Sequence, residues 1–203
     1  MGLKYVLGVL GTVLCAIPAL AQEAPAPAPA SAPAWFMPSE IRGGVLAHDA
    51  PPISDRTPEK GWDLNLEVLL QPLGAPDSLF IFRPRPMIGG TKNFQGKTDF
   101  AYFGLTWEFR PFQDALDIAS LSPLFLEPSF GLAFDDGRQH GTLANDQKLL
   151  GSVWQFRSAI DIGWHLTETW DISAYIDHIS NAGIFNKTNE GLETWGMRVG
   201  YNF

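Results

Sequence analysis

Residues 152–165 read SVWQFRSAIDIGWH, and large apolar side chains occupy most of the even positions of this stretch. The apolar positions are Trp154, Phe156, Ile160, Ile162 and Trp164. The polar positions between them include Gln155, Arg157, Asp161 and His165. Successive side chains of a β-strand point to opposite faces, so a period of two predicts a strand with one apolar and one polar face. The stretch is also as long as a membrane-crossing strand, which needs roughly 9–11 residues.

The same pattern recurs along the chain, more weakly at two places near the start. We expect strands at Ser39–Asp49, Trp62–Leu70, Arg85–Thr91, Ala101–Arg110, Leu124–Asp135, Ser152–His165, Trp170–Ser180 and Glu193–Phe203. The first and third of these alternate least clearly. An even number of antiparallel strands is what a closed single-chain outer-membrane barrel contains.

The two faces of these strands differ in a way that favours a membrane barrel over a soluble one. Charges of both signs share one face: Arg42, Glu67, Glu108, Arg110, Glu127, Arg157, Asp161, Asp177 and Arg198. The other face is aliphatic and aromatic, and includes Leu64, Phe103, Phe130, Ile160, Ile176 and Val199. A soluble sandwich or lipocalin-like barrel would also alternate, but it would keep its charges outside. We therefore predict an all-β fold, an eight-stranded antiparallel transmembrane β-barrel of the outer-membrane type, with charges in the lumen.

The two ends of the chain carry targeting signals. Residues 1–21 combine a basic start, an apolar segment and a small-x-small site, which predicts a signal peptide cleaved before Gln22. Residues 22–38 are rich in proline and alanine and are expected to form a linker before a barrel of residues 39–203. The terminal Phe203 is typical of the last strand of outer-membrane proteins, which the barrel-assembly machinery recognises.

The composition agrees with an outer-membrane location and argues against nucleic acid as a partner. The formal net charge of −8 argues against nucleic acid, which needs a basic face. The 7 Trp and 14 Phe are a high aromatic load, usual in barrels with aromatic girdles. We expect no metal or cofactor, because His48 and His165 fall on lumen faces and the loop around His140 lacks calcium-ligand spacing.

Three polar residues interrupt the apolar rows of the last two strands. His178 and Ser180 continue the lipid-facing row of Trp170–Ser180, and Glu193 continues that of the final strand. With the N-terminus in the periplasm, this hairpin opens on the outer side. Polar side chains on a lipid-facing row are costly, and Ser, His and Glu within mutual reach can form an acyl-transfer triad. The alternative is a turn serine, a solvated interfacial histidine and a loop charge.

The residues HISNAG at 178–183, followed by NEGLE at 189–193, resemble the lipid A 3-O-deacylase (PagL-type) family of outer-membrane barrels. The place of these residues at the outer end of the barrel points to lipopolysaccharide, which fills the outer leaflet, as the substrate. The resemblance implies that the protein hydrolyses the 3-O-linked acyl ester of lipid A, without a cofactor. It implies that His178 is the base, Ser180 the nucleophile and Glu193 the orienting acid, with Glu190 left as an alternative acid. Asn181 matches a position that the family needs for activity.

Other roles stay open at this point. The candidate donors for the oxyanion are Asn181, the backbone near Gly183, and Asn189. The competing functions are a non-enzymatic small barrel, such as an adhesin or stability protein, and a phospholipase or acyltransferase with the same triad. A homodimer is also left open.

Overall fold

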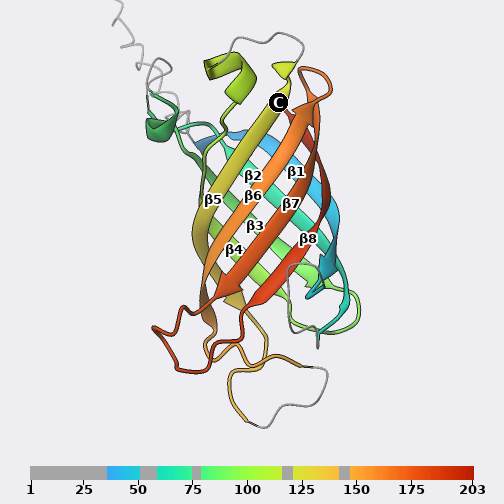
Figure 1. Cartoon of the computed structure of the whole chain (residues 1–203), viewed down its shortest axis with the longest axis vertical. Helices are drawn as coiled ribbons and strands as arrows, with labels where there is room; N and C mark the ends of the chain where they lie inside the picture. The colour runs from blue at the N-terminus through green and yellow to red at the C-terminus, as the bar shows by residue number, and fades with distance from the viewer. Residues whose placement is uncertain (1–35, 51–58, 75–78, 116–120, 142–146) are drawn as a thin grey trace, which may run out of the picture. The chain divides into compact units, whose positions relative to one another are not determined.

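The structure is a computed structural model that describes residues 36–50, 59–74, 79–115, 121–141 and 147–203. The predicted signal peptide and most of the predicted linker lie outside these residues. The strands are β1 (Pro38–His48), β2 (Gly61–Leu70), β3 (Arg85–Asn93), β4 (Phe100–Thr106), β5 (Leu124–Asp135), β6 (Trp154–His165), β7 (Trp170–Ser180) and β8 (Leu192–Asn202). Each strand pairs antiparallel with the next, and β1 also pairs with β8, so the sheet closes into a barrel (Figure 1). The predicted fold class is confirmed.

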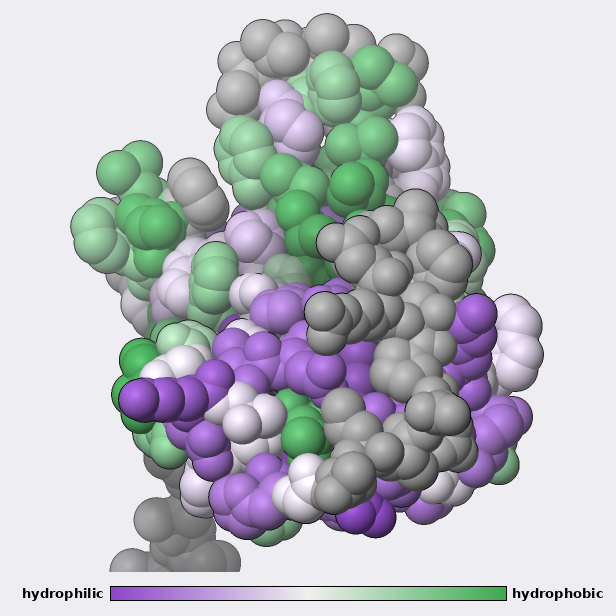
Figure 2. Space-filling model, turned by 60° about the horizontal axis from the view of Figure 1, so that its bottom comes forward, coloured by the Kyte–Doolittle hydropathy of each residue, from purple (hydrophilic) through white to green (hydrophobic). Residues whose placement is uncertain are grey.

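The barrel has two different ends (Figure 1). At the lower end in the figure lie the ends of β1, β3, β5 and β7 and the starts of β2, β4, β6 and β8, and we call this the loop end. The C-terminus lies at the opposite end, with the 3-10 turn η2 (Phe80–Phe82) and the π-helical turn η3 (Pro111–Ala115). Figure 2 shows hydrophilic residues gathered at the loop end and hydrophobic residues further along the molecule. No helix in the described part of the chain is long and apolar enough to cross a membrane.

The alternation in the sequence correctly predicted which side chains point outward. Leu64 is 49% exposed, Phe103 50% and Phe130 59% on the outer wall. Ile176 and Val199 are exposed as well, and Ile160 is half-buried on the same face. In a closed barrel these side chains meet the surroundings and not the core, so the apolar wall is the surface that lipid covers.

The lumen is filled by buried ion pairs. Arg42 donates to Glu127 at 2.7 Å, and Arg85 donates to Glu40 at 2.7 Å. The Arg157 Nε donates to Asp177 at 2.6 Å. The lumen also contains stacked groups, since the Arg157 guanidinium lies 3.8 Å from the centre of the Tyr102 ring. Charged groups removed from water need such partners, so the lumen is a packed polar core and not an open channel.

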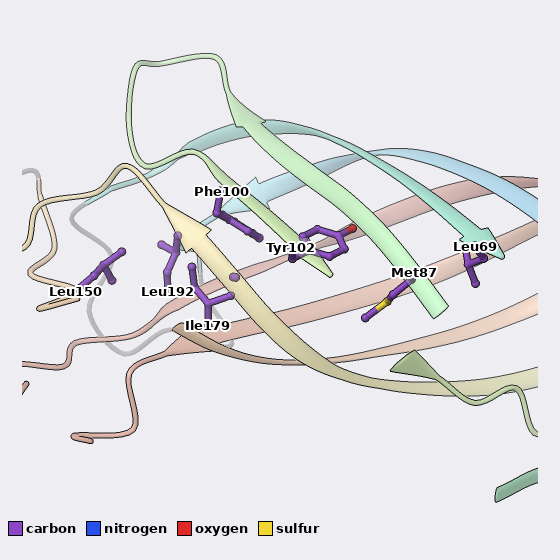
Figure 3. Packing of buried hydrophobic residues seen from close by; sticks show 8 residues of the cluster. Leu69, Met87, Phe100, Tyr102, Leu150, Ile179 and Leu192 are labelled. Carbon is purple, nitrogen blue, oxygen red and sulfur yellow. The ribbon is translucent and has the colours of Figure 1, made fainter. Parts of the chain in front are cut away.

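Near the loop end an apolar cluster closes the lumen. Figure 3 shows Phe100, Ile179, Leu192 and Leu150 turned toward the same interior space. Leu150 comes from the β5–β6 connection and is fully buried, as are Ile179 and Leu192 at the adjoining ends of β7 and β8. This contact brings the β5–β6 connection across the mouth of the barrel, next to the last hairpin.

One strand is shorter than the alternation predicts. The pattern predicts an extended chain throughout Ala101–Arg110, but β4 ends at Thr106. The cause lies in its partner, because Trp107 lies opposite Pro128, which has no N–H to donate to the ladder. Beyond Thr106, Trp107 N donates to the Pro128 carbonyl at 3.0 Å without a return bond, and an isolated bridge between Phe109 and Leu126 follows. Glu108 nevertheless faces the lumen mouth, where its carboxylate lies 3.8 Å from Arg85.

Candidate active site

Three sequence-predicted site residues share the outer face of β7 and β8 at the loop end. His178 lies directly opposite Glu193 in the register of the two strands. Ser180 is the last residue of β7 and lies two positions beyond His178, hence on the same face. Both strands keep their apolar rows outward, and a slip of one residue between them would turn one of these rows into the lumen.

The histidine and the glutamate are joined by a hydrogen bond. His178 Nδ1 lies 2.9 Å from Glu193 Oε1. Because a carboxylate only accepts, the Nδ1 atom carries the proton and Nε2 is left as the basic nitrogen. The His178 side chain is 43% exposed and that of Glu193 only 15%, so the carboxylate lies behind the imidazole and the imidazole lies at the surface. This is the arrangement of base and orienting acid in a triad.

Ser180 and His178 line one hollow on the outer wall. The hollow has a volume of about 210 Å³, and the rest of its lining is Phe130, Gly131, Phe156, Arg157 and Ser158. Phe185, from the β7–β8 connection, stacks on Phe156 with ring centres 5.5 Å apart. Phe156 is also the register partner of Ser180, so this aromatic pair lies beside the candidate nucleophile. Within the described chain the Ser180 hydroxyl makes no hydrogen bond, as is common before substrate binds.

Ser158 is a site residue that the sequence reasoning missed. It lies on the exposed face of β6, directly opposite His178. A signal was present, because Ser158 is the one polar residue among the apolar even positions of Trp154–His165. Phe130 precedes it in the same cross-strand row, and Glu193 ends that row on the other side of His178. The row thus places a second hydroxyl in the hollow.

Two of the three candidate oxyanion donors, Asn181 Nδ2 and the Gly183 N–H, donate to acceptors within the protein. Asn181 is fully buried, and its Nδ2 donates to the carbonyls of Leu150 and Thr188, both at 2.7 Å. Its Oδ1 accepts from the Gly183 N–H at 2.7 Å. Asn189 Oδ1 accepts from the Asn181 N–H at 3.0 Å. Asn181 therefore ties the β7–β8 connection to the β5–β6 connection, and its amide points inward, on the face opposite to that of Ser180.

Glu190, the alternative acid, lies elsewhere. Its Oε2 accepts from the Leu149 N–H at 2.6 Å, and its own N–H donates to the Leu149 carbonyl at 3.2 Å. The next residue, Gly191, has a φ of +66° and passes close to His178. A Cβ at Gly191 would lie 3.0 Å from His178 Cε1, so glycine makes room for the imidazole.

The two histidines expected on lumen faces, His48 and His165, have acidic neighbours. His48 Nδ1 lies 2.8 Å from Asp63, and its Nε2 lies 3.5 Å from Glu59. His165 lies 3.4 Å from Glu108. Among the described residues, no cluster of His, Cys, Asp and Glu has the arrangement of a metal site.

Comparison with known proteins agrees with the geometry of the last hairpin. The model of the family "Lipid A 3-O-deacylase (PagL)" matches residues 91–202. This range is more than half of the chain and includes the three triad candidates. The chain belongs to the PagL family. A solved structure described as that of the outer membrane enzyme PagL matches with a TM-score of 0.59 and 16% identity. The match covers 81% of this chain and 100% of that one, and it shows that the two share a fold.

A second solved structure, that of Neisserial surface protein A, matches with a TM-score of 0.45 and 11% identity, over 81% of this chain and 96% of the other. No curated protein sequence matches the chain. Membership of the PagL family and the closed barrel identify the protein as an outer-membrane enzyme of the lipid A deacylase class.

Proposed function

We propose that this protein hydrolyses the 3-O-linked acyl ester of lipid A with a triad of Ser180, His178 and Glu193. The observation that carries the proposal is the 2.9 Å hydrogen bond from His178 Nδ1 to Glu193, with Ser180 on the same outer face. This arrangement leaves an imidazole nitrogen free as a base next to a hydroxyl, at the rim of an apolar wall. Membership of the PagL family supports the same reaction.

The first chemical step forms an acyl-enzyme. The Ser180 oxygen attacks the ester carbonyl carbon, the carbonyl electron pair moves onto its oxygen, and His178 Nε2 takes the hydroxyl proton. The tetrahedral intermediate then collapses, and the alcohol oxygen of lipid A leaves with the proton from His178. The Glu193 carboxylate stabilises the imidazolium that exists between these two events.

The second step releases the fatty acid. Water gives a proton to His178 and attacks the acyl-Ser180 carbonyl, and the Ser180 oxygen leaves and regains its proton. In both steps negative charge develops on the carbonyl oxygen, which needs a hydrogen-bond donor. The Asn181 amide is occupied by loop carbonyls, whereas the Ser158 hydroxyl lines the hollow. We therefore assign the role of oxyanion donor to Ser158.

The location of the triad supports lipid A as the substrate class. The site opens sideways on the outer wall and not into the lumen, so a substrate reaches it from the bilayer. With both termini in the periplasm, the loop end lies in the outer leaflet, where lipopolysaccharide is the main lipid. The hollow beside Ser180 is bordered by Phe130, Phe156 and Phe185, which suit an acyl chain.

The test uses purified lipopolysaccharide and detergent-refolded protein. Mass spectrometry of lipid A should show the loss of one acyl chain with wild type and no loss with Ser180→Ala. Glu193→Gln should be severely impaired, whereas Glu190→Gln, the matched control, should retain near wild-type release. Lipid A that lacks the 3-O-acyl chain should release nothing. Release from that lipid A, or from phospholipid vesicles, would instead support another ester position or a phospholipase.

We further propose that residues 1–21 direct export and that Phe203 directs assembly into the outer membrane. Phe203 is 73% exposed, and its N–H donates to the Ser39 carbonyl at 3.0 Å. Replacing Phe203 with a polar residue should slow assembly, measured as delayed appearance of the heat-modifiable band on gels. Deleting residues 1–21 should leave the protein in the cytoplasm, and surface exposure of that variant would contradict the proposal.

A further inference from the structure

A buried lysine contacts the triad acid from behind. Lys148 belongs to the β5–β6 connection, and its side chain is only 2% exposed. Its ammonium nitrogen lies 3.2 Å from Glu193 Oε2 and 2.6 Å from Asp49 Oδ1. The two oxygens of the Glu193 carboxylate are thus divided, with Oε1 facing His178 and Oε2 facing Lys148.

The backbone around Lys148 is fixed in this place by several hydrogen bonds. The Lys148 N–H donates to Glu59 Oε1 at 2.8 Å, and the Asp49 N–H donates to the Glu193 carbonyl at 2.8 Å. The neighbouring Leu149 is bonded in both directions to Glu190. A side chain that is anchored this closely and kept from water cannot easily choose another partner.

We propose that Lys148 is a positioning residue that fixes the orientation of Glu193 and, through it, the proton of His178 on Nδ1. The inference rests on the triad proposed above and deepens it. An ammonium group has only donors, so whatever faces Lys148 at position 193 must be an acceptor. A carboxylate has two acceptor oxygens, so one can face Lys148 while the other accepts the Nδ1 proton of His178. The Nε2 atom of His178 then stays unprotonated and can act as the base.

The role has a consequence that can be measured in Glu193→Gln. Glutamine has one acceptor and one donor at its end. Lys148 requires the acceptor, so the amide NH₂ group turns toward His178 and donates to Nδ1. The imidazole proton then moves to Nε2, where it blocks the base. A triad held in the wrong tautomer loses about 10⁴-fold in kcat.

The experiment compares Glu193→Gln in two backgrounds. One is wild type, and the other is Asp49→Asn/Lys148→Met, which removes both buried charges together so that Asp49 is not left without its cation. Without Lys148 the glutamine can turn its oxygen to His178, and only the charge of the carboxylate is lost. We expect fatty-acid release to fall about 10⁴-fold in the first background and about tenfold in the second. Equal losses in both backgrounds would overturn the proposal.

A second measurement needs no change at Lys148 and no activity. The chain has four histidines, so ¹⁵N-histidine labelling allows the protonated nitrogen of His178 to be identified by long-range ¹H–¹⁵N correlation in detergent. We expect Nδ1–H in wild type and Nε2–H in Glu193→Gln; Nδ1–H in both would overturn the role of Lys148. Ser180→Ala is measured in parallel: if it releases fatty acid like wild type, the proposed triad is wrong, while the tautomer result still decides what Lys148 does.

Discussion

Gly191→Ala should lower the kcat of fatty-acid release by more than its loss of stability alone would cause. Gly191 has a φ of +66°, and an added Cβ would lie 3.0 Å from His178 Cε1. The left-handed backbone costs an L-residue about 1–2 kcal/mol. The contact is closer than Cβ atoms normally approach, so the imidazole, which forms the 2.9 Å bond to Glu193, must shift by a few tenths of an ångström. A misplacement of about 1 Å costs roughly 10²-fold, so a shift of a few tenths of an ångström should lower kcat by about three- to tenfold.

The chain offers a matched control in Gly96→Ala. Gly96 has a φ of +70°, and nothing lies within 4 Å of the position that an added Cβ would take, so this variant carries the same backbone strain without the contact. Thermal unfolding should show similar destabilisation of both variants, while fatty-acid release should fall only in Gly191→Ala. If Gly96→Ala loses as much activity as Gly191→Ala, the loss comes from general destabilisation and the reasoning about His178 is refuted.

The remaining predictions concern the triad, its second hydroxyl and the loop end. Ser180→Ala and His178→Ala should each lower the initial rate of fatty-acid release by several orders of magnitude, and the double variant little further, because a triad acts as a unit; additive losses would contradict this. Ser158→Ala should lower kcat about 10²-fold with little change in KM if its hydroxyl binds the oxyanion, and an unchanged kcat would leave it as the floor of the hollow. Burial raises the pKa of Glu59, but hydrogen bonds from His48 and neighbouring groups outweigh it and lower the pKa from 4.5 to about 2. Because the folded form binds this proton less readily than the unfolded form, ionised Glu59 stabilises the fold above pH 4.5, and this stabilisation is lost as the pH falls toward 2. The melting temperature should therefore fall less between pH 4.5 and 2 in Glu59→Gln than in wild type.

Most of the fold was predictable from the sequence because side-chain alternation carries it. In β6 every second residue is apolar except Ser158, and the charges between them include Arg157 and Asp161. The face of each strand follows from such a pattern without knowledge of the neighbours. The early end of β4 did not follow from it, because Trp107 and Phe109 continue the alternation and the cause is a proline in a different strand.

The candidate site was predictable to the same extent and for the same reason. His178, Ser180 and Glu193 lie in strands, so parity and one hairpin connection place them together. Lys148 could not be found this way, since it lies in a long connection between β5 and β6 that has no period. Its position depends on tertiary hydrogen bonds, such as the one that its N–H donates to Glu59, 89 residues away along the chain.

Asn181 faces inward, and its hydrogen bonds link the end of a predictable strand to a connection that the sequence pattern does not predict. Its backbone follows directly from β7, so its parity was predictable, but its amide bonds carbonyls of two separate connections. Through these bonds the end of β7, which holds Ser180, is fixed to the segment that carries Lys148. An asparagine in this place can therefore matter for activity without touching the substrate, because its loss frees both the nucleophile strand and the segment behind Glu193. We propose that these bonds are the structural origin of the requirement for Asn181 that the resemblance to the PagL family implies. Asn181→Ala tests this as a loss of activity accompanied by faster hydrogen exchange at the Leu149 and Leu150 amides.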